Sequence, residues 1–273
     1  MRVPIPTFTP DRKVVYKTIG DTELKLHVFE PKDKVIKKGG SREVVQETNR
    51  PAAVFFFGGG WNGGKLSQFY PHCQHLADQG IVAMAAEYRV KSRNGTTPFE
   101  CVMDGNSAIR WVRNHASELR IDPKRIIAGG GSAGGHVAAA TGTVPGLIEA
   151  GEDTQTSSLP NALILFNPVY DNGPGGYGHE RVKDRYTEIS PMHNISSEMP
   201  PAIVFLGTKD KFIPVKTAEK FRDKMKQAGV RSELKLYQGA THGFFNAKKK
   251  SSLDYRQTIM QMDDFLNSLG YFD

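Results

Sequence analysis

Residues 126–136 read IIAGGGSAGGH, and this stretch decides the fold class. Its leading apolar residues suit a buried strand, and the small residues after the serine suit the start of a helix. Gly130, Ser132 and Gly134 form the pattern Gly-x-Ser-x-Gly, which is typical of a sharp turn from a strand into a helix. Because such a turn pushes the serine hydroxyl toward a base, the pattern predicts a nucleophile at Ser132. The alternative is a glycine-rich turn that carries no chemistry.

Apolar segments and helical segments alternate along the rest of the chain. Strands are expected at residues 52–57, 81–87, 126–128, 162–166, 202–206 and 234–237. Helices are expected at residues 66–79, 99–115, 134–141, 216–228 and 252–269. This alternation predicts an α/β fold in which helices cover both faces of a mostly parallel central sheet.

The segment before the first of these strands has a different pattern. Residues 14–29 alternate apolar and polar side chains around Gly20, which predicts a β-hairpin and therefore antiparallel strands at one edge of the sheet. Residues 32–50 are charged and contain glycines, so we expect a loop there. No internal repeat or low-complexity tract interrupts the chain, and residues 1–273 are predicted to form a single domain.

The overall charge is basic, but its distribution argues against a polyanion partner. The chain has 36 basic and 29 acidic residues and a net charge of +7. The densest basic cluster is only Lys248-Lys249-Lys250, so nucleic-acid binding is not expected. No apolar run is long enough for a membrane span, and residues 1–7 lack the apolar core of a signal peptide. We therefore expect a cytoplasmic protein or the mature form of a secreted one.

Two cysteines are too few for a disulfide framework or a zinc-ligand array. Cys73 and Cys101 are expected to be free thiols, although a single bridge between them stays open. His72, Cys73 and His75 lie close together in the sequence, but no second cluster completes a metal site, and a helix surface is the better interpretation. We expect no metal and no cofactor.

A serine nucleophile needs a base, and the base needs an acid that orients it. His242 is the predicted base, because it follows the last strand and both candidate acids; a structural or surface histidine is the alternative. Asp210 is the predicted acid, and Asp171 after the preceding strand is its rival. Asp210 has the better setting because Gly207 ends its strand and the chain then leads into a helix.

Acyl transfer also needs hydrogen-bond donors for the developing oxyanion. The backbone N–H of Ala133, directly after the serine, is one candidate. Gly59 and Gly60 are the others, because they follow the strand at 52–57 and glycines let backbone N–H groups face a site closely. A glycine-rich connector without this role is the alternative.

These ordered motifs resemble those of α/β-hydrolase esterases of the hormone-sensitive-lipase-like group. The chain is similar to bacterial acetyl esterases and to acetylxylan or feruloyl esterases over roughly residues 15–270. The resemblance implies an α/β-hydrolase fold and a serine, acid, histidine order that Ser132, Asp210 and His242 follow. It also implies acetylated sugars or polysaccharides, such as acetylated xylan, as substrates.

Two features depart from the pattern of that group. The oxyanion loop of the group usually reads His-Gly-Gly-Gly, whereas Phe57 takes the place of the histidine here, so the bracing of the loop is open. The region before the glycines shows no helical cap, and we expect residues 172–179 to overhang the site instead. Trp61, Tyr177 and His179 are the candidate substrate contacts, with packing or exposed-loop roles as the alternative.

The sequence thus predicts a carboxylic ester hydrolase that works through an acyl-enzyme. An open site with little apolar covering favours a short acyl group on a polar alcohol, either a small molecule or a polysaccharide. A serine peptidase of the prolyl-oligopeptidase type is one alternative, although no propeller-sized region precedes the motifs. A non-catalytic receptor on a hydrolase fold is the other. The preferred acyl length, the alcohol and the oligomeric state stay open.

Overall fold

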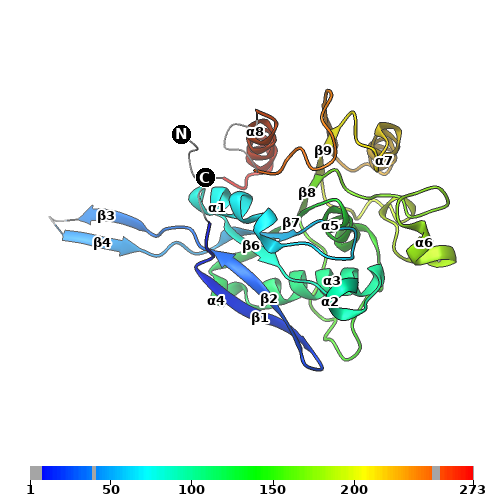
Figure 1. Ribbon diagram of the computed structural model, residues 1–273. Helices are drawn as coiled ribbons and strands as arrows, with labels where there is room; N and C mark the ends of the chain where they lie inside the picture. Colours follow the sequence, from blue (N-terminus) through cyan, green and yellow to red (C-terminus); the bar gives the residue numbers. More distant parts are fainter. Residues whose placement is uncertain (1–7, 39–40, 248–252, 273) are drawn as a thin grey trace, which may run out of the picture.

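The computed structural model describes residues 8–38, 41–247 and 253–272, and its centre is an eight-stranded sheet (Figure 1). The strand order is β1-β2-β6-β5-β7-β8-β9-β10. The strands are β1 (Arg12–Ile19), β2 (Thr22–Phe29), β5 (Arg50–Phe56), β6 (Val82–Ala86), β7 (Ile121–Gly131), β8 (Ala162–Phe166), β9 (Ala202–Gly207) and β10 (Ser232–Tyr237).

Most of this sheet is parallel. Six strands, in the spatial order β6-β5-β7-β8-β9-β10, run parallel to one another. The strands β1 and β2 form an antiparallel hairpin, and β2 pairs antiparallel with β6. Every residue of β5, β6, β8 and β9 is buried, as expected for parallel strands covered on both faces. The edge strand β1 alternates between more and less exposed residues instead. The predicted fold class and the predicted hairpin are confirmed.

Helices cover the sheet on both faces (Figure 1). The longer ones are α1 (Tyr70–Asp78), α3 (Pro98–Asn114), α5 (Ala133–Thr143), α7 (Val215–Gln227) and α8 (Leu253–Ser268). Val54 packs in one core with α3, α5 and α7, whereas its neighbour Phe55 packs in the other core with α1 and α8. Successive side chains of a strand point to opposite faces, so a continuous apolar run such as β5 feeds both cores.

The predicted loop at residues 32–50 is wrong. Most of this segment forms a separate two-stranded antiparallel sheet of β3 (Lys34–Lys38) and β4 (Ser41–Val45), which projects from the main body (Figure 1). The sequence holds β-branched residues in both halves of the segment with a pair of glycines between them, which is a hairpin signal. The many charged residues obscured that signal.

The described residues before the glycine loop form strands and connecting turns but no helix, in agreement with the expected lack of a large cap. Cys73 on α1 and Cys101 on α3 are buried free thiols in opposite cores, so they form no bridge. Burial raises the pKa of both thiols. None of the described helices has the length and apolar character needed to cross a membrane.

Candidate active site

Ser132 lies at the turn between β7 and α5, with φ of 56° and ψ of −120°. A non-glycine residue rarely adopts a positive φ, so the surrounding structure holds this serine in a strained conformation. The flanking glycines allow the turn. A Cβ on Gly130 would lie 2.4 Å from the Gly134 carbonyl oxygen, and one on Gly134 would lie 2.1 Å from that of Phe56. The structure thus has the sharp turn that the sequence pattern predicts.

His242 and Asp210 meet Ser132 at the carboxyl ends of the strands. His242 lies in the loop after β10, and its Nε2 is 2.9 Å from Ser132 Oγ. Its Nδ1 lies 2.7 Å from Oδ2 of Asp210, which follows β9. The His242 side chain is 22% exposed whereas that of Asp210 is fully buried, so substrate can reach the imidazole but not the carboxylate.

Of the two candidate acids, Asp210 rather than Asp171 is the carboxylate that contacts His242. The Oδ1 atom of Asp210 accepts hydrogen bonds from the backbone N–H groups of Phe212 (2.8 Å) and Ile213 (3.0 Å). These bonds orient the carboxylate so that its other oxygen faces the imidazole. Asp171 instead accepts a hydrogen bond from the N–H of Gly173, two residues further along its own loop.

Asn167 is a site residue that the sequence analysis missed. It follows β8 with a φ of 34° and is fully buried, yet it lines the same cavity as Ser132. Its Oδ1 accepts a hydrogen bond from the N–H of Gly243 (3.0 Å), and its Nδ2 lies 3.4 Å from His242 Nε2. The amide therefore holds the histidine loop against the end of β8. An asparagine directly after an apolar strand was the available signal.

The two glycines predicted as oxyanion donors lie in the same cavity as Ser132, and Ala133 follows the serine directly. Gly59 and Gly60 line the cavity that holds Ser132, with φ of 143° and 60°. A Cβ on Gly59 would lie 2.1 Å from the Gly63 carbonyl oxygen, so only glycine fits there. Ala133 is the first residue of α5, where a backbone N–H has no partner within the helix. The N–H of Gly58, by contrast, is bonded to Gln68 Oε1 (2.6 Å).

The glycine loop at residues 58–60, the candidate oxyanion loop, is braced without a histidine at position 57. Phe57 is buried and stacks on Tyr88 with ring centroids 4.2 Å apart, and the Tyr88 hydroxyl donates to the Phe57 carbonyl oxygen (2.5 Å). On the other side, Gln68 accepts from Gly58 and donates through Nε2 to Asn246 Oδ1 (3.0 Å). Asn246 then donates to the Gly243 carbonyl oxygen (2.7 Å). The glycine loop is thereby tied to the loop that carries His242.

The catalytic cavity has a volume of about 470 Å³, and its rim is partly aromatic. Tyr177 and Phe212 line it, and their rings meet edge to face with centroids 5.6 Å apart. Tyr177 comes from the segment expected to overhang the site. His179 is not among the lining residues, because its Nδ1 lies 2.9 Å from the Asn172 carbonyl oxygen. Trp61 lies buried beside the glycine loop and lines a neighbouring cavity.

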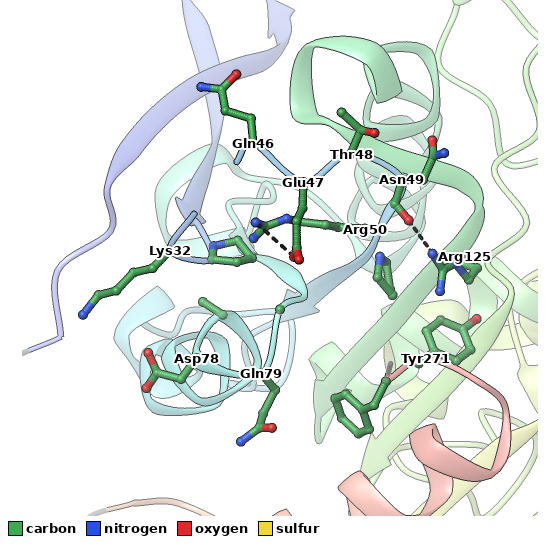
Figure 2. Close-up of a pocket in the computed structure, with 15 residues that line it drawn as sticks. Lys32, Gln46, Glu47, Thr48, Asn49, Arg50, Asp78, Gln79, Arg125 and Tyr271 are labelled. Atoms are coloured by element: carbon green, nitrogen blue, oxygen red, sulfur yellow. Dashed lines mark hydrogen bonds and ion pairs between the residues drawn. The ribbon is translucent and has the colours of Figure 1, made fainter. Parts of the chain in front are cut away.

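A larger cavity of about 760 Å³ lies at the opposite end of the strands (Figure 2). It adjoins Arg50 at the start of β5, whereas the glycine loop follows the other end of that strand. Arg50 is 95% buried and pairs with Glu47 at 3.4 Å (Figure 2). Ligands of open α/β sheets bind beyond the carboxyl ends of the strands, so this cavity is not where Ser132 acts.

The expected helix surface at His72, Cys73 and His75 is wrong for two of these three residues, because α1 turns them into the core against the sheet. His72 and Cys73 are fully buried, and His75 Nε2 lies 2.9 Å from an oxygen of Asp263. In the part of the chain that the structure describes, His, Cys, Asp and Glu side chains form no group of three that could hold a metal ion.

Comparison with known proteins agrees with this geometry. The BD-FAE family model matches residues 42–163, and the Dienelactone hydrolase family model matches residues 176–270. The probable carboxylic ester hydrolase LipM of Mycobacterium tuberculosis is 32% identical over 67% of this chain and 47% of its own length. Esterase LipC of the same organism is 28% identical over 71% of this chain and 53% of its own. The chain thus spans about half the length of these curated relatives.

Solved structures match over nearly the whole chain. The apo form of Thermogutta terrifontis esterase 2 is 43% identical, with a TM-score of 0.89 and 98% of each chain covered. Its propionate-bound form is 42% identical, with a TM-score of 0.88, covering 98% of this chain and 97% of the other. At this identity and coverage the likeness extends beyond the fold. The chain therefore belongs to the α/β-hydrolase esterase family that includes Thermogutta terrifontis esterase 2.

Proposed function

We propose that this protein is a serine carboxylesterase that hydrolyses short acyl esters through an acyl-enzyme. The observation that carries the proposal is the hydrogen-bonded chain from Ser132 Oγ through His242 to Asp210, with distances of 2.9 Å and 2.7 Å. A serine hydroxyl becomes a useful nucleophile only beside a base, and an imidazole becomes a useful base only when a third group holds it. Both requirements are met at one edge of the sheet.

The reaction follows from these positions. Ser132 Oγ attacks the ester carbonyl carbon while its proton passes to His242 Nε2. The N–H groups of Gly59, Gly60 and Ala133 stabilise the oxyanion of the tetrahedral intermediate. The imidazolium, stabilised by Asp210, then gives its proton to the leaving alkoxide, and the acyl group stays on the serine. A water molecule repeats the sequence with His242 as base, which releases the carboxylic acid.

A short acyl group suits the cavity and agrees with the relatives. Tyr177 and Phe212 line this cavity of about 470 Å³, and their rings meet edge to face, so they close it on that side against a long chain. Thermogutta terrifontis esterase 2 has been solved with propionate and with butyrate bound, and also phosphorylated by paraoxon. We infer that this chain likewise takes acyl groups of about two to four carbons.

The finer proposal concerns the alcohol. The motifs resemble those of acetyl esterases of the hormone-sensitive-lipase-like group, which supports acetyl esters of sugars or polysaccharides, such as acetylated xylan, as the natural substrates. The lack of a helical cap among the described residues before the glycine loop supports a bulky polar alcohol, because nothing there encloses an apolar one.

An activity profile tests both levels of the proposal. We expect kcat/KM to be highest for p-nitrophenyl acetate, propionate or butyrate and to fall for longer chains, with measurable release of acetate from acetylated xylan. The Ser132→Ala variant is expected to lose at least about 10³-fold in kcat. Comparable cleavage of a proline-linked p-nitroanilide would favour a peptidase, and unchanged activity of Ser132→Ala would refute the assigned nucleophile.

A further inference from the structure

The catalytic cavity is lined by one permanently charged side chain. Arg181, in the short helix α6 (His179–Val182), lines the cavity of about 470 Å³ that also holds Ser132. Among the described residues that line this cavity, Arg181 is the only arginine or lysine, and none is an aspartate or a glutamate. A guanidinium stays protonated at any pH at which the enzyme works. The cavity therefore presents a fixed positive charge to an ester at Ser132.

Contacts with the glycine loop hold this guanidinium in position. Arg181 Nη1 donates a hydrogen bond to the Gly60 carbonyl oxygen. Its Cζ lies over two aromatic rings, 5.5 Å from the centroid of Trp61 and 5.7 Å from that of Tyr177. The faces of aromatic rings attract a cation, and Trp61 is itself packed at 1% exposure. The charge is therefore placed beside the proposed oxyanion loop before any substrate binds.

The guanidinium stays accessible to a ligand. The Arg181 side chain is 35% exposed, although the Trp61 ring beside it is buried. Among the described residues, only Gly60 accepts a hydrogen bond from it, and a guanidinium has more N–H donors than one carbonyl oxygen uses. The planar fork of N–H groups matches the two oxygens of a carboxylate. Arg181 thus has donors left for an anionic group in the cavity.

Glu180 is the one carboxylate that pairs with Arg181 in the described part of the chain, and the pair is weak. Its Oε1 lies 3.1 Å from Arg181 Nε, but the Glu180 side chain is 69% exposed. Exposed ion pairs contribute little because water competes for both partners. Glu180 lines the neighbouring cavity of about 400 Å³ and not the catalytic one. An anion in the catalytic cavity therefore meets a cation that is only partly neutralised.

We propose that Arg181 binds a carboxylate carried by the ester substrate while the ester group lies at Ser132. The inference rests on the proposed esterase function and adds a charge preference to it. The carboxylate can belong to the alcohol, as in an acetylated acidic sugar, or to the acyl group, as in a half-ester of a dicarboxylic acid. Both offer the same two oxygens to the guanidinium. An uncharged ester reacts at the same serine but gains nothing from this ion pair.

The test uses two pairs of esters, and the members of each pair differ in one charged oxygen. 4-Acetoxybenzoate carries the carboxylate on the alcohol, and 4-acetoxyacetophenone has a methyl group in place of the charged oxygen. Ethyl hydrogen succinate carries the carboxylate on the acyl group, and ethyl levulinate is its neutral counterpart. We would measure kcat/KM for all four at about pH 7.5, where both carboxylates are ionised. The compared quantity is the ratio of the anionic to the neutral ester within each pair.

Two substitutions of Arg181 separate its charge from its bracing of the loop. Arg181→Met removes the charge and should lower the ratio by about 3- to 10-fold in at least one pair, as expected for a partly exposed pair of a guanidinium and a carboxylate. Arg181→Lys keeps the charge and should retain most of the ratio. A role limited to holding the Gly60 carbonyl oxygen would lower kcat/KM for all four esters alike and leave both ratios unchanged.

Glu180→Gln tests the same charge in the opposite direction. It removes the competing carboxylate and should raise the ratio in the pair that Arg181→Met lowers, and this readout remains if Arg181→Met does not fold. Raising the salt concentration from about 0.02 M to about 0.5 M should lower the wild-type ratio, because salt screens exposed charges. Arg185→Met is the matched control, since Arg185 pairs with Glu188 at 2.7 Å and lines neither cavity. It should leave both ratios unchanged.

The possible failures are distinguishable with p-nitrophenyl acetate as the reference ester. A wild-type chain that does not hydrolyse it would overturn the esterase proposal, and the carboxylate site with it. Normal hydrolysis of p-nitrophenyl acetate, with both ratios unmoved by Arg181→Met and by Glu180→Gln, would overturn the carboxylate site alone. A ratio that falls only for 4-acetoxybenzoate would support the site and place the carboxylate on the alcohol, whereas one that falls only for ethyl hydrogen succinate would place it on the acyl group.

Discussion

Gln68 is the residue on which the bracing of the oxyanion loop can be tested most directly. Its side chain joins two loops, because Oε1 accepts from the Gly58 N–H at 2.6 Å and Nε2 donates to Asn246 at 3.0 Å. Gln68→Met keeps the length of the side chain and removes both hydrogen bonds. The glycine loop then loses its link to the loop of His242, although no proposed catalytic group is itself removed.

The structure sets the size of the expected effect. Two hydrogen bonds at about 0.5–1.5 kcal/mol each give a loss of about 1–3 kcal/mol in the free energy of unfolding. At about 2–4 °C per kcal/mol, the melting temperature should fall by about 2–12 °C. Removing an oxyanion donor outright costs about 10²–10³-fold in kcat, and Gln68→Met only loosens the donors at Gly59 and Gly60. We therefore expect kcat to fall about 10-fold, or about 1.4 kcal/mol.

Steady-state kinetics with p-nitrophenyl acetate and thermal melting give the two readouts. KM should change less than kcat, because the donors act mainly on the transition state. Gln74→Met is the matched control, since the Gln74 amide donates an exposed hydrogen bond to Asp78 within α1 rather than to either loop. Asn246→Ala should act through the same link, so its effect and that of Gln68→Met should not add. A lower melting temperature with unchanged kcat would refute the positioning role.

Three further predictions concern other residues. Asn167→Asp places a carboxylate near His242 Nε2, because the amide nitrogen of Asn167 lies 3.4 Å from that atom. The acid limb of the pH profile of kcat/KM should therefore move upward by about 1 pH unit, and an unmoved limb would contradict this contact. Burial lowers the pKa of His72 to about 3 in the folded protein, whereas the same imidazole in the unfolded chain binds a proton below about pH 6.5. The free energy of unfolding therefore falls as the pH drops through that range. The free energy of unfolding of His72→Phe, measured with urea, should therefore rise by about 2 kcal/mol relative to that of the wild type when the pH is lowered from 7 to 5. A difference between the two proteins that stays constant with pH would be inconsistent with a neutral buried imidazole. Paraoxon should add one diethylphosphoryl group to the peptide that contains Ser132, as read by mass spectrometry, and a modified Ser132→Ala protein would point to another nucleophile.

Short sequence patterns predicted the elements that local forces control. The turn at Ser132, the glycines after β5 and the strands with continuous apolar runs all follow from sterics and burial within a few residues. The order of Ser132, Asp210 and His242 sufficed to place them at one sheet edge, because the carboxyl ends of parallel strands meet there. The hairpin of β3 and β4 was missed because its charged residues resemble those of a loop.

The sequence by itself determined the fold class, the family resemblance and the residues that form the proposed triad. Only the tertiary structure decided how they are supported. Gln68 and Asn246 lie 178 positions apart, and Asn167 and Gly243 lie 76 apart, so no local pattern reports their contacts. A turn is encoded in a few neighbouring residues, whereas a brace or a binding cavity exists only after the sheet has brought distant segments together.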